Sequence, residues 1–573
     1  MEYDFLVIDL IENLDELLKI AFTEGISQKY CGLLDEYIFI LALAFYRVLL
    51  NVNTPFFYIF MTRISTLICT ILVLILFSCN ENGKEILRAE IPISVSGGRI
   101  TGTSDSSGLV KIYKGIPFAA PPLANLRWKA PQPVLPWEGI KTCDTNPAAP
   151  MQKAPVPFFS WSEEFLIPKA PISEDCLYLN VWTAAASSTE KRPVLVWIYG
   201  GGFSSGSNTV PLYDGEELAK QGIVVVAINY RVGILGFFAH PELSTESLEH
   251  TSGNYGLLDQ IAGLEWVKNN IAAFGGDPEK VTIAGQSAGA FSVNALVVSP
   301  KAKGLFHQVI AQSGGMFNKG SGLISSHKVA EESGKRLTES LGISLGELRK
   351  KPADSLLTIS GRFGPVVDGI ILPNVREAFE SKNYADVPLL TGWNADDRVS
   401  GNTAILPDEY VANAKKEYGK RADEFLTLFP ADNQEVLQKS LHSLGVLAFG
   451  LQNYTWAKMQ TERGTHPAFV YYFTRVPPGE PNYGAFHSAE ISYALHTLRK
   501  WNRPFEKIDF DLESKMSTFW VNFVKTGNPN GDLLEYWPIF DTSNPKVLEL
   551  GNEIKSRTIP FWDQLKFLES LNH

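Results

Sequence analysis

The sequence has little of what marks a nucleic-acid-binding, metal-binding or phosphate-binding protein. Its 573 residues carry 62 acidic and 51 basic side chains, a net charge of −11, and no cluster of Lys and Arg. Such an acidic chain has no cluster of positive charge that could bind the phosphate backbone of a nucleic acid. No His, Cys and Asp residues stand at zinc-binding spacing, and the glycines at 200–202 lack the Lys-Ser/Thr that follows in a P-loop. We therefore expect no nucleic-acid partner, no metal and no cofactor.

The apolar tract near the N-terminus is too short for an ordinary membrane-spanning helix. It comprises fourteen uncharged residues, Ile64–Phe77, directly after Arg63. This length suits the apolar core of a signal peptide. The tract ends in Leu76-Phe77-Ser78-Cys79, which resembles a bacterial lipobox. We therefore expect a protein exported from a bacterial cell as a periplasmic or outer-membrane lipoprotein, with lipid on Cys79 and membrane association through that lipid. Ordinary signal-peptidase cleavage or an uncleaved anchor is the alternative.

A signal peptide lies near the start of a chain, yet sixty residues precede Met61. Residues 1–36 carry nine acidic side chains against two lysines, the wrong sign for a signal peptide. We interpret residues 1–60 as a mis-called extension, 61–79 as the signal and lipobox segment, 80–95 as a tether and 96–566 as one catalytic domain. In the alternative, the extension is real and Tyr37–Leu50 packs or spans with the next segment.

Gly285-Gln286-Ser287-Ala288-Gly289 fits the nucleophile-elbow pattern G-x-S-x-G. The apolar segment Val281–Ile283 precedes it as a strand should, and Phe291–Val298 follows it as a helix should, which is the setting that the motif requires. The serine of an elbow sits on a strained turn, so its neighbours must lack bulk, as Gly285 and Gly289 do. Because Gly and Ser are common turn residues, the rest of the catalytic machinery must be found elsewhere in the chain.

A glycine loop upstream is the expected source of oxyanion donors. Pro193–Tyr199 reads as a buried strand, and three glycines and Phe203 follow it at once. We expect the N–H groups of Gly201, Gly202 and Ala288 to point at the oxyanion of an acyl-transfer intermediate. The alternative is a flexible glycine turn without this role.

In this type of site the acid and then the histidine follow the serine along the chain. His487 lies in a loop that leads into an apolar helical stretch. The apparent strand 387–392 is followed by Asp396 and Asp397, two adjacent carboxylates that compete for the role of acid. Asp368 is a third candidate, but its setting is typical of a turn. The histidines that follow the serine are His307, His327, His442, His466, His487, His496 and His573.

Long segments between residues 97 and 562 resemble the type-B carboxylesterases, a group that includes cholinesterases and bacterial para-nitrobenzyl esterases. The segments that carry the resemblance are Tyr113–Pro122, Leu126–Trp128, Glu174–Val181, Asn254–Gln260, Phe274–Pro278, Val281–Gly289 and Met516–Asn530. The resemblance implies the α/β-hydrolase fold, with a large, mostly parallel, twisted central sheet flanked by helices in a single catalytic domain. The alternation of apparent strands and helices also indicates an α/β protein.

The resemblance also assigns residues to roles. The nucleophile falls on Ser287, the base on His487 and the acid on Asp397 rather than Asp396. The family most often has Glu-Gly where this chain has Asp397-Arg398, so the shorter acid must approach the histidine more closely. Ser313 and Glu490 fall on positions that support the triad.

In the family, cysteines at 143 and 176 form a disulfide, which implies an oxidising compartment. Two buried thiols are the alternative. No other cysteine follows position 79.

The sequence thus predicts a serine carboxylic-ester hydrolase that acts on small-molecule esters through an acyl-enzyme. An acyltransferase or amidase with the same triad is the first alternative. A non-catalytic, cholinesterase-like adhesion protein is the second, and it is disfavoured because Ser287, His487 and the glycine loop are all present.

Overall fold

The computed structural model describes residues 91–571, apart from 158–159, 318–323 and 400–403. These residues belong to one compact unit, Ile86–His573. The expected extension, the signal segment with Cys79, and most of the tether lie outside the described residues.

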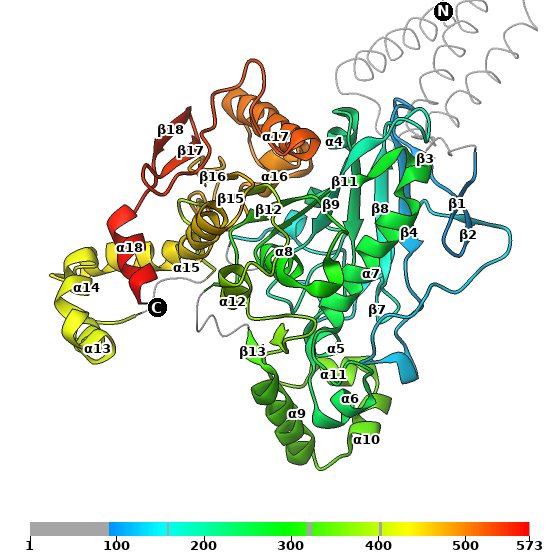
Figure 1. Cartoon of the computed structure of the whole chain (residues 1–573), viewed down its shortest axis with the longest axis horizontal. Helices are drawn as coiled ribbons and strands as arrows, with labels where there is room; N and C mark the ends of the chain where they lie inside the picture. Colours follow the sequence, from blue (N-terminus) through cyan, green and yellow to red (C-terminus); the bar gives the residue numbers. More distant parts are fainter. Residues whose placement is uncertain (1–90, 158–159, 318–323, 400–403, 572–573) are drawn as a thin grey trace, which may run out of the picture. The chain divides into compact units, whose positions relative to one another are not determined.

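One large sheet dominates the described part of the chain (Figure 1). It has eleven strands, and those from β17 to β10 all run parallel to their neighbours, while β18 at one edge and β8, β4 and β3 at the other are antiparallel. In spatial order the strands are β18 (Ile554–Thr558), β17 (Lys546–Leu550), β16 (Ala468–Phe473), β15 (Leu389–Asn394), β12 (Gln308–Gln312), β11 (Gly276–Gln286), β9 (Arg192–Ile198), β10 (Val224–Ile228), β8 (Tyr178–Thr183), β4 (Lys111–Pro117) and β3 (Thr103–Ser104).

Helices cover both faces of this sheet (Figure 1). One group packs over β8–β11: α4 (Glu216–Lys220), α16 (Ile491–Ala494) and α17 (Lys507–Thr526). The second group is α7 (Tyr255–Asn270), α8 (Ala288–Val298), α12 (Val375–Glu380) and the long α15 (Gln434–Arg463). The remaining α-helices are α5 (Gly233–Phe237), α6 (Pro241–Glu246), α9 (His327–Leu341), α10 (Leu345–Lys350), α11 (Ala353–Leu357), α13 (Pro407–Tyr418), α14 (Ala422–Leu428) and α18 (Trp562–Ser570).

The central strands are buried on both faces. Every residue of β10 is buried, as is every residue of β15 and β16. A parallel strand covered by helices on both sides has no solvent face, so its sequence is an unbroken apolar run rather than an alternation. The expected α/β architecture with a mostly parallel central sheet is confirmed. Within the described ranges, we find no helix with the length and apolar character that crossing a membrane requires.

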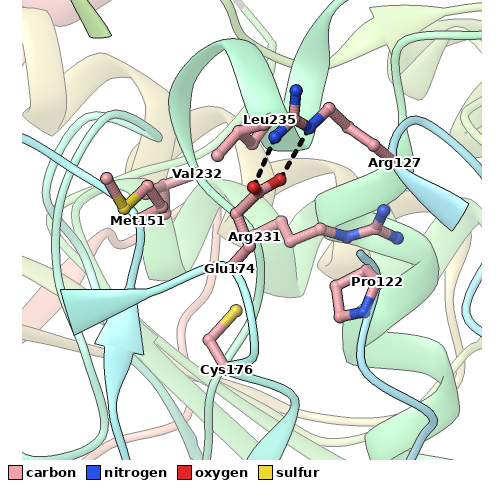
Figure 2. Close-up of a pocket in the computed structure, with 8 residues that line it drawn as sticks. All are labelled: Pro122, Arg127, Met151, Glu174, Cys176, Arg231, Val232 and Leu235. Carbon is pink, nitrogen blue, oxygen red and sulfur yellow. Dashed lines mark hydrogen bonds and ion pairs between the residues drawn. The ribbon is translucent and has the colours of Figure 1, made fainter. Parts of the chain in front are cut away.

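The prediction of a disulfide between Cys143 and Cys176 is wrong for this structure, in which both are free, buried thiols. Their side chains occupy different settings. The sulfur of Cys143 lies 4.0 Å from the carbonyl oxygen of Gly115, whereas Cys176 lines a small cavity beside Arg127 and Glu174 (Figure 2). Burial raises the pKa of Cys143 to about 12 and raises that of Cys176 as well, so both thiols stay protonated at neutral pH.

A buried ion pair joins the end of β10 to α7. Arg231 donates from Nε and Nη2 to the two carboxylate oxygens of Asp259, at 2.8 and 2.7 Å, and its backbone N–H donates to the same group at 3.0 Å. Both side chains are at most 4% exposed. Arg231 also donates to the carbonyl of Lys129, so the pair ties the loop that leaves β10 to α7 and to the segment around Lys129.

We expect Asp259→Asn to lower the free energy of unfolding by about 3–5 kcal/mol, because it leaves the guanidinium of Arg231 buried without a counter-charge. Urea denaturation of both proteins measures the difference. Glu435→Gln is the matched control, since Glu435 pairs with Lys439 on the exposed surface of α15 and should contribute little. Equal losses in the two variants would contradict a special role for the buried pair.

Candidate active site

Ser287 sits on a strained turn between β11 and α8. Its φ of 55° and ψ of −125° are unfavourable for a residue with a Cβ. Its N–H donates to the carbonyl of Gln312 on β12 at 2.9 Å, and its carbonyl accepts from Phe291 in α8 at 3.0 Å. The turn is therefore held from both sides, and the side chain of Ser287 is left partly exposed while its neighbours are buried.

The two glycines of the elbow are required by close packing. A Cβ on Gly289 would collide with the carbonyl of Ile198 in β9, and one on Gly285 would lie about as close to the backbone of Gly289. Helix α8 can therefore pack this closely against β9 and β11 only without side chains at these positions.

The glycine loop after β9 lies against the elbow. A Cβ on Gly200 would stand 2.7 Å from the carbonyl oxygen of Gln286 and 3.1 Å from the Cβ of Ser287. Gly201, with φ of 108°, and Gly202, with φ of 61°, have left-handed conformations that favour glycine. No described residue accepts a hydrogen bond from the N–H of Gly201 or Gly202.

His487 and Asp397 are brought together from chain segments 90 residues apart. The Nδ1 of His487 lies 2.5 Å from Oδ1 of Asp397, and the two side chains are 2% and 0% exposed. Asp397 is the third residue after β15, and its Oδ2 accepts from the backbone N–H of Asn394, the last residue of that strand, at 3.0 Å. A hydrogen bond to the carboxylate requires a proton on Nδ1, so the Nε2 of the neutral ring is the basic atom.

The neighbouring carboxylate, Asp396, holds the backbone of the histidine loop instead. Its Oδ2 accepts from the N–H of Ala485 at 2.8 Å, and its own N–H donates to the carbonyl of Ala485 at 3.0 Å. Its Oδ1 lies 3.3 Å from Nε2 of His442 on α15. The two adjacent aspartates therefore face different partners, and Asp397 is the one on the imidazole.

Asp368, the third acidic candidate, belongs to a turn away from this histidine. One of its oxygens accepts from the N–H groups of Ile370, Ile371 and Leu372, and the other from Thr251 and Asn254.

The Nε2 of His487 faces the elbow but contacts the residue before the serine. The side-chain nitrogen of Gln286 lies 3.2 Å from it. Among the described contacts there is no hydrogen bond between Oγ of Ser287 and His487. The structure thus brings Asp397, His487 and the elbow together, with the imidazole of His487 directed at Gln286.

The chain is similar in sequence to a known protein family and to several of its members. Residues 89–567 match the model of the carboxylesterase family. The chain belongs to the carboxylesterase family. It is 37% identical over 475 residues to the fumonisin B1 esterase of Sphingopyxis macrogoltabida, over 78% of this chain and 85% of that protein. It is 32% identical over 553 residues to the cocaine esterase of Homo sapiens, over 87% and 95% of the two chains.

A solved structure of PNB esterase is similar to this carboxylesterase with a TM-score of 0.71 and 29% identity, covering 83% of this chain and 98% of that one. The resemblance inferred from the sequence motifs is therefore confirmed, and so is the α/β-hydrolase fold. The protein is a carboxylic ester hydrolase of this family.

A buried polar network supports Asp397 and His487 in the carboxylesterase. Glu490, three residues after the histidine, accepts from the side-chain amide of Gln312 at 3.1 Å and from that of Asn394 at 2.6 Å. The same Asn394 amide donates to the carbonyl of Phe486 at 2.7 Å. The network ties the ends of β12 and β15 to the histidine loop. Ser313, the other expected supporting residue, is fully buried directly after β12, and its N–H donates to the carbonyl of Gly392 in β15.

Two aromatic rings flank the imidazole, and the sequence alone did not identify Phe449 as one of them. Phe449, on α15, stacks on His487 with ring centroids 4.4 Å apart and planes 23° apart. Trp161 meets the same ring edge-on at 6.0 Å, and its N–H donates to the hydroxyl of Ser488 at 3.2 Å. Phe449 belongs to no local motif. It reaches His487 only because of the path that α15 takes over β15 and β16.

Burial, and then the charge of Asp397, raises the pKa of Glu490 to about 7. A glutamate in the unfolded chain titrates near its ordinary value of 4.5. Between pH 4.5 and about 7 the folded protein therefore keeps a proton that the unfolded chain has released. The contribution of Glu490 to the free energy of unfolding therefore falls as the pH rises through this window and is constant above it.

We expect Glu490→Gln to remove this part of the decline, which amounts to about 3 kcal/mol at most. Urea denaturation at several pH values between 4 and 8 measures it. Because Glu490 is itself protonated below about pH 7, Glu490→Gln should leave the acid limb of ester hydrolysis close to that of the wild type.

Glu513→Gln is the matched control. Burial also raises the pKa of Glu513, a residue of α17, to about 7. Its carboxylate accepts from the backbone N–H of Leu498. Both variants should flatten the stability curve, and neither should move the acid limb of hydrolysis. A stability curve for Glu490→Gln that keeps the wild-type decline between pH 4.5 and about 7 would contradict the buried proton on Glu490.

Proposed function

We propose that this carboxylesterase hydrolyses small-molecule carboxylic esters through an acyl-enzyme on Ser287, with His487 as the base, Asp397 as the acid, and the N–H groups of Gly201, Gly202 and Ala288 as oxyanion donors. The observation that carries the proposal is the arrangement of His487. Its Nδ1 is fixed by Asp397, and its Nε2 faces the elbow whose strained turn presents Ser287.

The sheet explains why these groups can act together. The glycine loop, the elbow and the acid loop leave the carboxyl ends of β9, β11 and β15, and the histidine loop follows β16. Carboxyl ends of parallel strands meet at one edge, where α/β enzymes place their ligands. Residues from four segments therefore converge without any of them being near another in sequence.

The chemistry follows from the positions of the protons. His487, neutral with its proton on Nδ1, takes the hydroxyl proton of Ser287 at Nε2 as Oγ attacks the ester carbonyl. The carbonyl oxygen becomes an oxyanion, which the N–H groups of the glycine loop and Ala288 stabilise. The imidazolium then gives its proton to the departing alcohol. Water enters, loses a proton to Nε2, and releases the acid from Ser287 by the reverse route.

The residues that line the site determine which alcohol and acyl groups the enzyme accepts. The relatives' names point to different esters, fumonisin B1 in one and cocaine in the other. Simple para-nitrophenyl esters of increasing acyl length therefore make the appropriate first substrates.

We expect Ser287→Ala to lower kcat for a para-nitrophenyl ester by at least about 10³-fold, because the members of a triad act as a unit. Ser333→Ala, which removes an exposed hydroxyl on α9, is the control and should keep full activity. The matching para-nitroanilide tests the amidase alternative, and an added alcohol acceptor tests acyl transfer. Near-normal turnover in Ser287→Ala would refute the assignment.

We also propose that the protein is exported and carries lipid on Cys79. The support is the sequence Leu76-Phe77-Ser78-Cys79 after a short apolar tract. Expression in a bacterial host, followed by mass analysis of the membrane fraction, should give a mature N-terminal peptide that begins with lipidated Cys79. Cys79→Ser should abolish the lipid mass. A peptide from residues 1–60 in the mature protein would contradict this interpretation of the N-terminus.

A further inference from the structure

The basic nitrogen of His487 already has a hydrogen-bonding partner, and it is not the serine. The side-chain nitrogen of Gln286 lies 3.2 Å from Nε2. Gln286 is the last residue of β11, pairs with Gln312 of β12, and is 2% exposed. Its backbone is fixed by the sheet and its side chain has little room, so the contact follows from the fold.

The protonation of the imidazole decides what this contact can be. Because Asp397 binds Nδ1, the proton of the neutral ring is on Nδ1, and Nε2 carries a lone pair. An amide N–H donates to that lone pair. The imidazolium has N–H at both positions, and its Nε2–H would face another donor. The amide nitrogen of Gln286 therefore fits the neutral ring and opposes the protonated one.

We propose that Gln286 is a positioning residue for the base, whose amide donates to Nε2 of neutral His487 and holds that nitrogen unprotonated beside Ser287. The inference rests on the proposed function, since it assigns a partner to the base of that mechanism. When Oγ of Ser287 gives its proton to Nε2, the O–H bond breaks, the N–H bond forms, and the Gln286 amide releases the nitrogen. Gln286 exchanges no proton.

The charges of the other groups around the imidazole explain why an uncharged partner at Nε2 matters for its protonation. Asp397 on Nδ1 and Glu490, whose charge acts on both Asp397 and His487, are negative when ionised. The phenol of Tyr471 is buried near Asp397 and Glu490. Phe449 from α15 and Trp161 present uncharged rings. The neutral amide of Gln286 thus donates to the lone pair against a background of carboxylates that favour the cation.

The test replaces the amide by a group that prefers the other protonation state. In Gln286→Glu, a carboxylate beside Nε2 accepts from the imidazolium, so the acid limb of kcat/KM should move to higher pH by about one unit or more. Gln286→Met removes the donor without adding charge and should move the limb in the same direction by less. Gln132→Glu adds the same charge at an exposed position and should leave the profile as in the wild type.

A second readout does not need activity. In ¹⁵N-labelled Ser287→Ala enzyme, Gln286 is the remaining partner of Nε2, so adding Gln286→Met should move the Nε2 resonance of His487 toward that of a free lone pair. An unchanged resonance, or superimposable pH profiles for Gln286→Glu and Gln132→Glu, would overturn the proposal. Full activity in Ser287→Ala would refute the proposed function instead, and the resonance would still report on the contact.

Discussion

The site depends on one backbone constraint, the turn that holds Ser287 at φ 55° between β11 and α8. Such a conformation costs on the order of 1–3 kcal/mol and persists only where the surroundings determine it. Here β11 is paired with β9 and β12 up to the turn, and α8 begins at the very next residue. The strain is therefore fixed by the sheet, and the serine projects from the edge while its neighbours stay buried.

The same sheet also determines where the other parts of the site lie. The strands β9, β11, β12, β15 and β16 lie side by side and run in one direction, so the loops that follow them share an edge. Asn394 links the acid loop to the histidine loop, because it binds Asp397 through its backbone and Glu490 and Phe486 through its side chain. A displacement of one strand end would move the acid, the base and their supporting carboxylate together.

Sequence reasoning reached the parts that carry local patterns. The elbow, the glycine loop and the buried strands are visible as short motifs and apolar runs. The alternation of strands and helices indicated an α/β protein, and the family resemblance implied the α/β-hydrolase fold. It could not choose by itself between Asp396 and Asp397, because both stand in the same loop and only the tertiary contact with Ala485 or with His487 separates them. The cysteine pairing failed for a similar reason, since both thiols are free and Cys176 lines a cavity beside Arg127. Phe449 lies on a helix with no motif, and its stacking on His487 depends on the path of α15.

The protonation of the base is then a matter of balance among its neighbours. Asp397 must be ionised to hold Nδ1–H, and this favours a charged ring. Glu490 would add to that effect, but burial raises its pKa to about 7, so near neutral pH it carries only part of its charge. At Nε2 the sheet supplies an uncharged amide from Gln286. A base must be neutral to accept the serine proton and must tolerate charge once it has done so. One fixed carboxylate, one partly protonated carboxylate and one neutral donor meet both needs better than three charges would.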